Sequence, residues 1–124
     1  MFLNFSQFGM LFAAISVILG AFGAHALKSK LSAEMLTVFE VGVRYQMYHA
    51  LGLILLGIWA LPQSNPYIIW AGWSFIIGIV LFSGSLYLLS LTGINSIGAI
   101  TPIGGLFFIT GWLLFLLGSL IKGS

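Results

Sequence analysis

Long apolar segments separated by short polar stretches make up most of the chain. Four of them cover about residues 2–27, 45–61, 67–91 and 101–121. A membrane-spanning helix needs roughly 20 apolar residues, and backbone groups in lipid must be paired within the segment, which favours helices. The pattern therefore predicts an all-α, polytopic membrane protein whose four transmembrane helices form one bundle.

The second segment is preceded by a polar lead-in. Ser32 is a suitable N-cap, and Glu34 follows in the first turn, where the helix dipole favours a negative charge. We therefore expect one helix over about 33–61 whose first part is amphipathic and lies near the membrane interface; a break near Gly42 is the alternative. The whole chain, 1–124, is then a single membrane domain with helices at about 2–27, 33–61, 67–91 and 101–121.

Two short connections predict how the helices follow one another. The stretch 62–66 holds two prolines and is typical of a tight turn, so the helices on either side should be antiparallel neighbours. Thr101 and Pro102 fit the N-cap and first position of the last helix, because proline loses nothing at the first helical position. A proline kink within a longer helix is the alternative.

Small residues recur at helical spacing in two segments. Close backbone contact holds helices together in lipid, where no hydrophobic force acts between them. The last helix should therefore pack through a seam at every seventh residue, and the first should lie centrally in the bundle. The residues of the two stripes are Gly9, Ala13, Ser16, Gly20, Gly23 and Ala24, and Gly104, Gly111 and Gly118.

Composition agrees with a lipid environment. Hydrophobic residues make up 60% of the chain and charged residues 5%, against about 25% charged residues in a typical soluble domain. A net charge of +2 from so few groups does not form the clustered basic face that nucleic acid requires. The chain also has no cysteine.

The first apolar segment resembles a signal peptide, but nothing basic precedes it, so we expect a retained helix.

The distribution of basic residues predicts an orientation. Lys28, Lys30 and Arg44 lie on the side of the first loop, and Lys122 lies on the other. The positive-inside rule then places the first and third loops in the cytoplasm and both termini outside a cell membrane. Aromatic residues near the segment ends are expected to anchor the helices at the interface; these are Tyr67, Trp70, Trp73 and Trp112, the last of which fits a deeper position as well.

A polar run from Glu40 to Ala50 leads into the second apolar segment. Glu40 and Arg44 are spaced i,i+4 with the acid first, the better order for a helical ion pair. Tyr45 and His49 form a second such pair, and Gln46 lies beside them. His49 precedes the end of the segment by about 18 Å of helix, well inside a hydrocarbon core of about 30 Å. Ionisable groups at that depth usually face the bundle interior and have partners.

Further polar groups on the first-loop side are available as partners. His25 ends the first segment, and Thr101 begins the last, where a helix N-terminus favours negative charge. The sequence therefore predicts one polar pocket on this side for a small anionic ligand or a lipid headgroup. The candidate ligand-binding residues are Arg44, His49, Gln46, Tyr45, His25, Glu40 and Thr101.

Other interpretations of the same residues stay open. Glu40 and Arg44 are most simply a structural ion pair, and the two histidines interhelical hydrogen-bond partners. A His–His–Glu metal site is chemically conceivable, but a metal-binding spacing is absent, so we predict neither a metal nor another cofactor. The chain has no aspartate and no recognisable nucleophile motif, which leaves enzymes the least favoured class.

Four ordered motifs resemble the domain-of-unknown-function 423 family of small membrane proteins. They are G-A-F-G-A-H-A-L at 20–27, F-x-x-G-V-R-Y-Q-x-Y-H-A-L-G-L at 39–53, L-F-S-G-S-L-Y-L-L at 81–89 and I-T-P-I-G-G at 100–105. The resemblance implies a bacterial inner-membrane protein and brings no established activity. In that family the position of Glu40 is often not acidic, which weakens any mechanism that rests on it.

Two function classes follow. The first is a component that binds or transports a small anion or lipid headgroup in the polar pocket. The alternative is a non-catalytic assembly factor or accessory subunit, in which the polar cluster only stabilises the bundle and the glycine seams contact a partner protein. A homo-oligomer is a separate expectation for the partners of this chain. Small multidrug exporters share the chain's size but depend on an acidic residue in the first helix, which is absent here.

Overall fold

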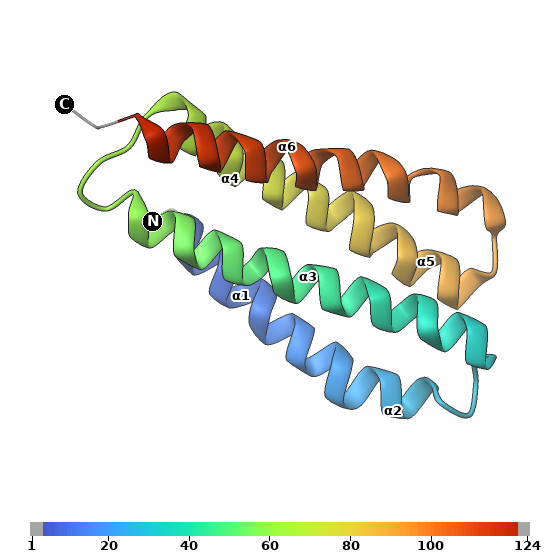
Figure 1. Ribbon diagram of the computed structural model, residues 1–124. Coiled ribbons are helices and arrows are strands. Elements are labelled where there is room, and N and C mark those ends of the chain that lie inside the picture. The colour runs from blue at the N-terminus through green and yellow to red at the C-terminus, as the bar shows by residue number, and fades with distance from the viewer. Residues whose placement is uncertain (1–3, 122–124) are drawn as a thin grey trace.

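The computed structural model describes residues 4–121, and every regular element in this range is helical (Figure 1). This confirms the all-α fold. The predicted start of the first helix at residues 2 and 3, and Lys122, lie outside the described residues. The elements are α1 (Phe5–Ile18), a π-helical turn (Leu19–Gly23), α2 (Ala24–Leu27), α3 (Ala33–Trp59), α4 (Pro66–Gly78), a second π-helical turn (Ile79–Ser83), α5 (Gly84–Thr92), a 3₁₀ turn (Asn95–Ala99) and α6 (Thr101–Leu120).

Side-chain caps fix where three of the helices begin. Asn4 and Gln7 form a capping box at α1, in which each side chain accepts a hydrogen bond from the other's backbone N–H, at 3.0 and 2.8 Å. The Ser32 hydroxyl accepts from the backbone of Met35 at 3.1 Å, which confirms the predicted start of α3. Asn65 caps α4 in the same way, with proline at the first helical position.

The structure decides between the alternatives at Gly42 and corrects the predicted start of the last helix. Helix α3 runs without a break through Gly42, so the alternative of an interruption there is wrong. Thr101 is the first residue of α6 and not its N-cap, a place taken by Ile100. The reason is the 3₁₀ turn before it, which brings Ile100 into helical geometry (φ −77°, ψ −31°) one residue early.

Helix α3 lies at the centre of the arrangement. It contacts α1 on one side and α4, the second π turn and α5 on the other, whereas α6 packs mainly on α4 and the second π turn. Figure 1 shows α1 and α2 at the edge of the bundle. The expectation that the first helix is central is therefore wrong. In lipid an apolar helix need not be buried on all sides, so its small-residue face required only one neighbour.

The predicted glycine seams are confirmed as close contacts. A Cβ atom on Gly9 would lie 2.5 Å from the carbonyl oxygen of Ala50 in α3. On α6, a Cβ atom on Gly104 would meet the backbone of Phe82, and one on Gly111 would lie 2.6 Å from the ring of Phe75. Glycine is needed at these positions because atoms of the neighbouring helix occupy the space that a side chain would fill.

The buried core lies between α3, α4 and α6, with Phe75 near its middle and Phe5 and Phe12 of α1 packed against its edge. Within the described residues, three helical spans are long and apolar enough to cross a membrane: Phe5–Leu27, Pro66–Thr92 and Asn95–Leu120. Helix α3 has 27 residues and comparable length, but it carries the polar run. Among the described residues, the hydrophobic ones that are fully buried are Ala50, Leu53, Leu56, Ile68, Ala71 and Phe75.

The two π-helical turns flank the same part of α3. A Cβ atom on Gly20, in the first turn, would lie 3.2 Å from the side chain of Val43. From the second turn, the Ser83 hydroxyl donates to the carbonyl oxygen of Gly42 at 2.6 Å. Such turns are rare and widen the helix by one residue. Neither was predicted from the apolar pattern.

Candidate functional site

Gln46 lies inside the bundle and joins three helices. It is 3% exposed, and its amide nitrogen donates to the carbonyl oxygen of Phe12 in α1 at 2.9 Å. The phenol of Tyr87 in α5 donates to its amide oxygen at 2.6 Å. Both ends of the Gln46 side chain are therefore occupied by protein partners.

His49 is held in an aromatic cluster one turn deeper. It is 5% exposed, and its ring stacks on Phe108 with centroids 3.5 Å apart. The indole N–H of Trp112 donates to Nε2 at 3.0 Å, and Nδ1 lies 2.7 Å from the carbonyl oxygen of Tyr45. An indole only donates and a carbonyl only accepts. The pair of contacts therefore assigns the neutral tautomer with the proton on Nδ1, and both ring nitrogens are used.

Arg44 and Glu40 face outward from the same helix. Their side chains are 58% and 44% exposed, and the closest nitrogen and oxygen atoms lie 3.9 Å apart. Arg44 is level with the first turns of α6, because the next residue, Tyr45, packs its ring on Phe82 (centroids 4.7 Å apart), which itself lies against Gly104. The pair therefore lies near one end of the bundle, outside the buried cluster.

Replacing Glu40 with glutamine is expected to change the free energy of unfolding by less than about 0.5 kcal/mol, because exposed ion pairs contribute little. Unfolding of the detergent-solubilised protein, followed by tryptophan fluorescence, measures this. A loss of about 2 kcal/mol or more would instead place Glu40 in the packed interior, since only buried or network interactions reach that size.

The remaining candidates lie in other surroundings. The Thr101 hydroxyl is 2.5 Å from that of Ser85, which ties the start of α6 to α5. His25 is exposed on α2, on the edge helix. Tyr45 is partly exposed and stacks between Phe82 and His49. The structure thus brings Gln46, His49 and Tyr45 into one packed region, and it leaves Arg44, Glu40 and His25 on the surface.

The sequence did not indicate which aromatic residues contact His49 inside the bundle. By its sequence position Trp112 fits an interfacial anchor or a deeper place, and neither expectation includes its hydrogen bond to His49, which lies 63 positions earlier in the chain. Phe108 carried no polar signal at all. Their spacing was the one signal available in the sequence. Phe108 and Trp112 are four residues apart on α6, so their rings lie on the same helix face and can contact one side chain together.

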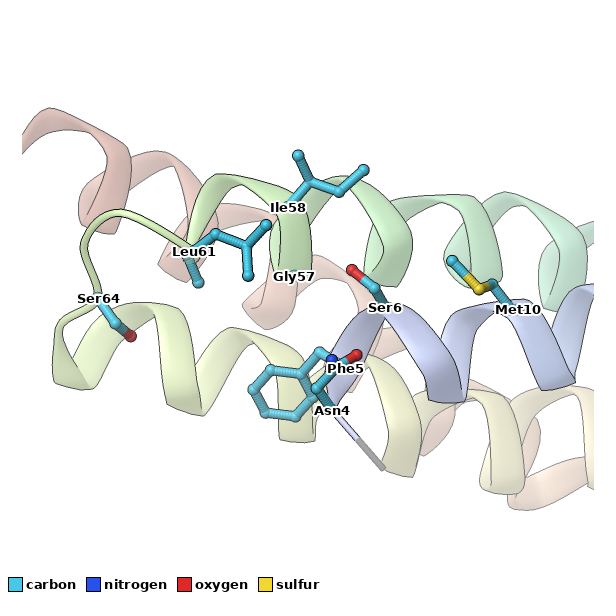
Figure 2. A pocket seen from close by; sticks show the side chains of 9 residues that line it. Asn4, Phe5, Ser6, Met10, Gly57, Ile58, Leu61 and Ser64 are labelled. Carbon is cyan, nitrogen blue, oxygen red and sulfur yellow. The ribbon is translucent and has the colours of Figure 1, made fainter. Parts of the chain in front are cut away.

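None of three surface cavities is lined by Gln46, His49 or Arg44, although Ser85 and Tyr87 line one of them. One of about 490 Å³ is at the opposite end of the bundle, where the first turn of α1 meets the last turn of α3. Figure 2 shows the lining residues Phe5, Ser6 and Met10 of α1 beside Ile58 of α3 and Leu61 just after it. The other two are apolar surfaces on α4 and along α5. Within residues 4–121, no group of three His, Cys, Asp or Glu side chains is placed to share a metal ion.

Comparisons with known proteins agree with this architecture. The family model described as "Protein of unknown function (DUF423)" matches residues 19–105. A UPF0382 membrane protein of Staphylococcus saprophyticus is 53% identical over 111 residues, covering 90% of this chain and 92% of its own. The UPF0382 membrane protein YwdK of Bacillus subtilis is 47% identical over 112 residues, covering 90% and 91%. No solved structure matches the chain.

The relatives are named as membrane proteins, and residues 4–121 of this chain include three helical spans that suit a bilayer. A match over residues 19–105 covers the polar run of α3, both π turns and the start of α6. The chain is therefore a membrane protein that belongs to the DUF423 family of proteins of unknown function.

Proposed function

We propose that this protein is a non-catalytic accessory or assembly component of the membrane, in which the buried polar cluster holds the helices together. The observation that supports this is that the buried polar side chains form hydrogen bonds with other groups of the protein. Within the described residues, no buried side-chain nitrogen or oxygen lacks a hydrogen-bond partner. A ligand that used Gln46 or His49 would first have to displace Tyr87 or Trp112.

The proposed topology has four spans, with α3 as the fourth. Its 27 residues extend about 40 Å at 1.5 Å per residue, enough for a hydrocarbon core of about 30 Å. Gln46 and His49 lie within that depth and point inward, which is how polar residues are tolerated in membranes. The end that carries Lys28, Lys30 and Arg44 is then cytoplasmic by the positive-inside rule.

Transport and catalysis receive less support from the same geometry. Arg44, the strongest anion-binding group of the predicted pocket, is exposed and not directed at His49. His49 would act as a base only by giving up the hydrogen bond from Trp112, because Nδ1 already carries its proton. The three cavities described above are lined mainly by apolar surface, and neither Gln46, His49 nor Arg44 lines any of them.

The edge helix is the surface that this role would use. Helix α1 packs mainly on α3, and Phe5 at its start also reaches Gly72 and Trp73 of α4. Met10, Val17 and Ile18 of α1 are each about half exposed. Exposed Ala14 and Ala21 lie on the same outer side, and small residues of this kind allow a partner helix to approach closely. The partner is then another membrane helix.

Crosslinking in intact membranes tests the proposal. A photoreactive residue at Val17 should give a reproducible adduct of defined mass with a second membrane protein, and Ala21→Leu, which blocks close approach, should abolish it. The same residue at Leu113 on α6 is the control and should give lipid adducts only. Self-adducts alone would favour a homo-oligomer, and the absence of protein adducts at Val17 would contradict the accessory role.

A further inference from the structure

One line of exposed side chains runs along most of α3. It consists of Arg44, Tyr48, Leu51, Leu55 and Ile58, each about half exposed. The steps of four and three residues place them on a single face of the helix. We call this line the α3 stripe.

The stripe lies between the two sides of α3 that other helices cover. On one side α1 approaches, with Gly9 against Ala50 and Ile54. On the other side α6 approaches, with Trp112 on His49. The stripe positions fall between these contacts around the helix, so the fold itself leaves this face of its central helix uncovered.

The chemistry of the stripe changes along its length. At the end near the start of α6, Arg44 carries a positive charge with five N–H donors, and Glu40 lies too far away, at 3.9 Å, to take a hydrogen bond from it. Tyr48 adds a half-exposed phenol one turn deeper. Beyond it the stripe is aliphatic. An arginine whose N–H donors are not used by Glu40 is thus followed by an apolar track.

The dimensions match one lipid molecule. Ile58 is fourteen positions after Arg44, or about 21 Å along the helix. One leaflet contributes about 15 Å of hydrocarbon, half of the usual core, and the headgroup region extends beyond it. A phosphate at Arg44 therefore places an acyl chain alongside Tyr48, Leu51 and Leu55.

We infer that the α3 stripe is a binding site for one anionic phospholipid, with its phosphate on the Arg44 guanidinium and an acyl chain along Leu51 and Leu55. A planar guanidinium suits two phosphate oxygens at once. An anionic headgroup is favoured over a zwitterionic one because Lys28 and Lys30 belong to the same end of the bundle and would repel a headgroup ammonium. This site is independent of the accessory role proposed above.

Native mass spectrometry of the delipidated protein, titrated with dioleoyl phosphatidylglycerol in detergent, tests the site. The full chain should bind one lipid in preference to phosphatidylcholine. Arg44→Gln should weaken that binding about tenfold, equivalent to about 1.4 kcal/mol. Lys30→Gln removes the same charge from the same end but lies off the stripe, so it should leave binding within about twofold, as expected for a screened surface charge.

Several outcomes would overturn the inference. Equal weakening by Arg44→Gln and Lys30→Gln would mean diffuse attraction to the basic end and no site. Displacement of the lipid by inorganic phosphate alone would mean that the acyl track contributes nothing. If Arg44→Gln fails to fold, Arg44→Lys keeps the charge without the planar fork, and binding equal to that of the natural protein would then contradict the proposed phosphate contact.

Discussion

Replacing His49 with alanine is expected to lower the free energy of unfolding by about 3 kcal/mol, the usual cost of deleting a buried ring and leaving a cavity. The imidazole stacks on Phe108 at 3.5 Å and also contacts Phe75. Its loss leaves the indole N–H of Trp112 without its acceptor. Unfolding in mixed micelles, followed by tryptophan fluorescence, measures the change, and Trp112 reports directly on the site.

His25 supplies a matched control. It is the other histidine of the chain and is exposed on α2, so His25→Ala should change stability by less than about 0.5 kcal/mol. His49→Phe separates the two contributions, because it keeps a ring but orphans the indole; a loss of about 1 kcal/mol is expected. Equal, small effects of His49→Ala and His25→Ala would show that the aromatic cluster is not packed as described.

Replacing Gly104 with alanine is expected to cost about 2 kcal/mol, within the range for overpacked interiors. The added methyl group would meet the backbone nitrogen and Cα of Phe82, which cannot turn aside as a side chain can. Helix α6 would have to move away from the second π turn, and the hydrogen bond between Thr101 and Ser85 would be strained with it.

The neighbouring glycine is the control. A Cβ atom on Gly105 would come no closer than 3.9 Å to the Phe82 ring, so Gly105→Ala should be neutral or stabilise the helix by up to about 1 kcal/mol. The same unfolding measurement compares the two variants. If both behave alike, α6 does not approach the second π turn as closely as described.

The elements themselves were largely predictable from the sequence. Apolar runs of sufficient length, the Ser32 cap and the proline-containing turn at 62–66 gave the helices and their order to within a few residues. The glycine repeat on the last helix also predicted a close contact correctly. These features are local: each depends on residues within one helix or one turn.

The neighbours of each helix were not predictable in the same way. Lipid accepts apolar side chains on any face, so hydrophobic periodicity does not say which side of α1 or α6 is covered. The polar run of α3 indicated an inward face for Gln46 and His49, and the structure confirms that orientation. Nothing local indicated that Phe108 and Trp112 would receive His49, or that Arg44 would point outward beside it.

The second π turn changes the direction in which the side chains that follow it point. Ser83 lies one residue further along than regular winding would require, and each residue of an α-helix turns the chain by about 100°. The extra residue between Ile79 and Ser83 therefore rotates everything that follows, including Tyr87, by about a quarter turn. That rotation aims Ser83 at Gly42 and Tyr87 at Gln46. Deleting one residue from this turn would leave the sequence of α5 unchanged. Its side chains would nevertheless point in other directions, and the contacts of Ser83 with Gly42 and of Tyr87 with Gln46 would be lost.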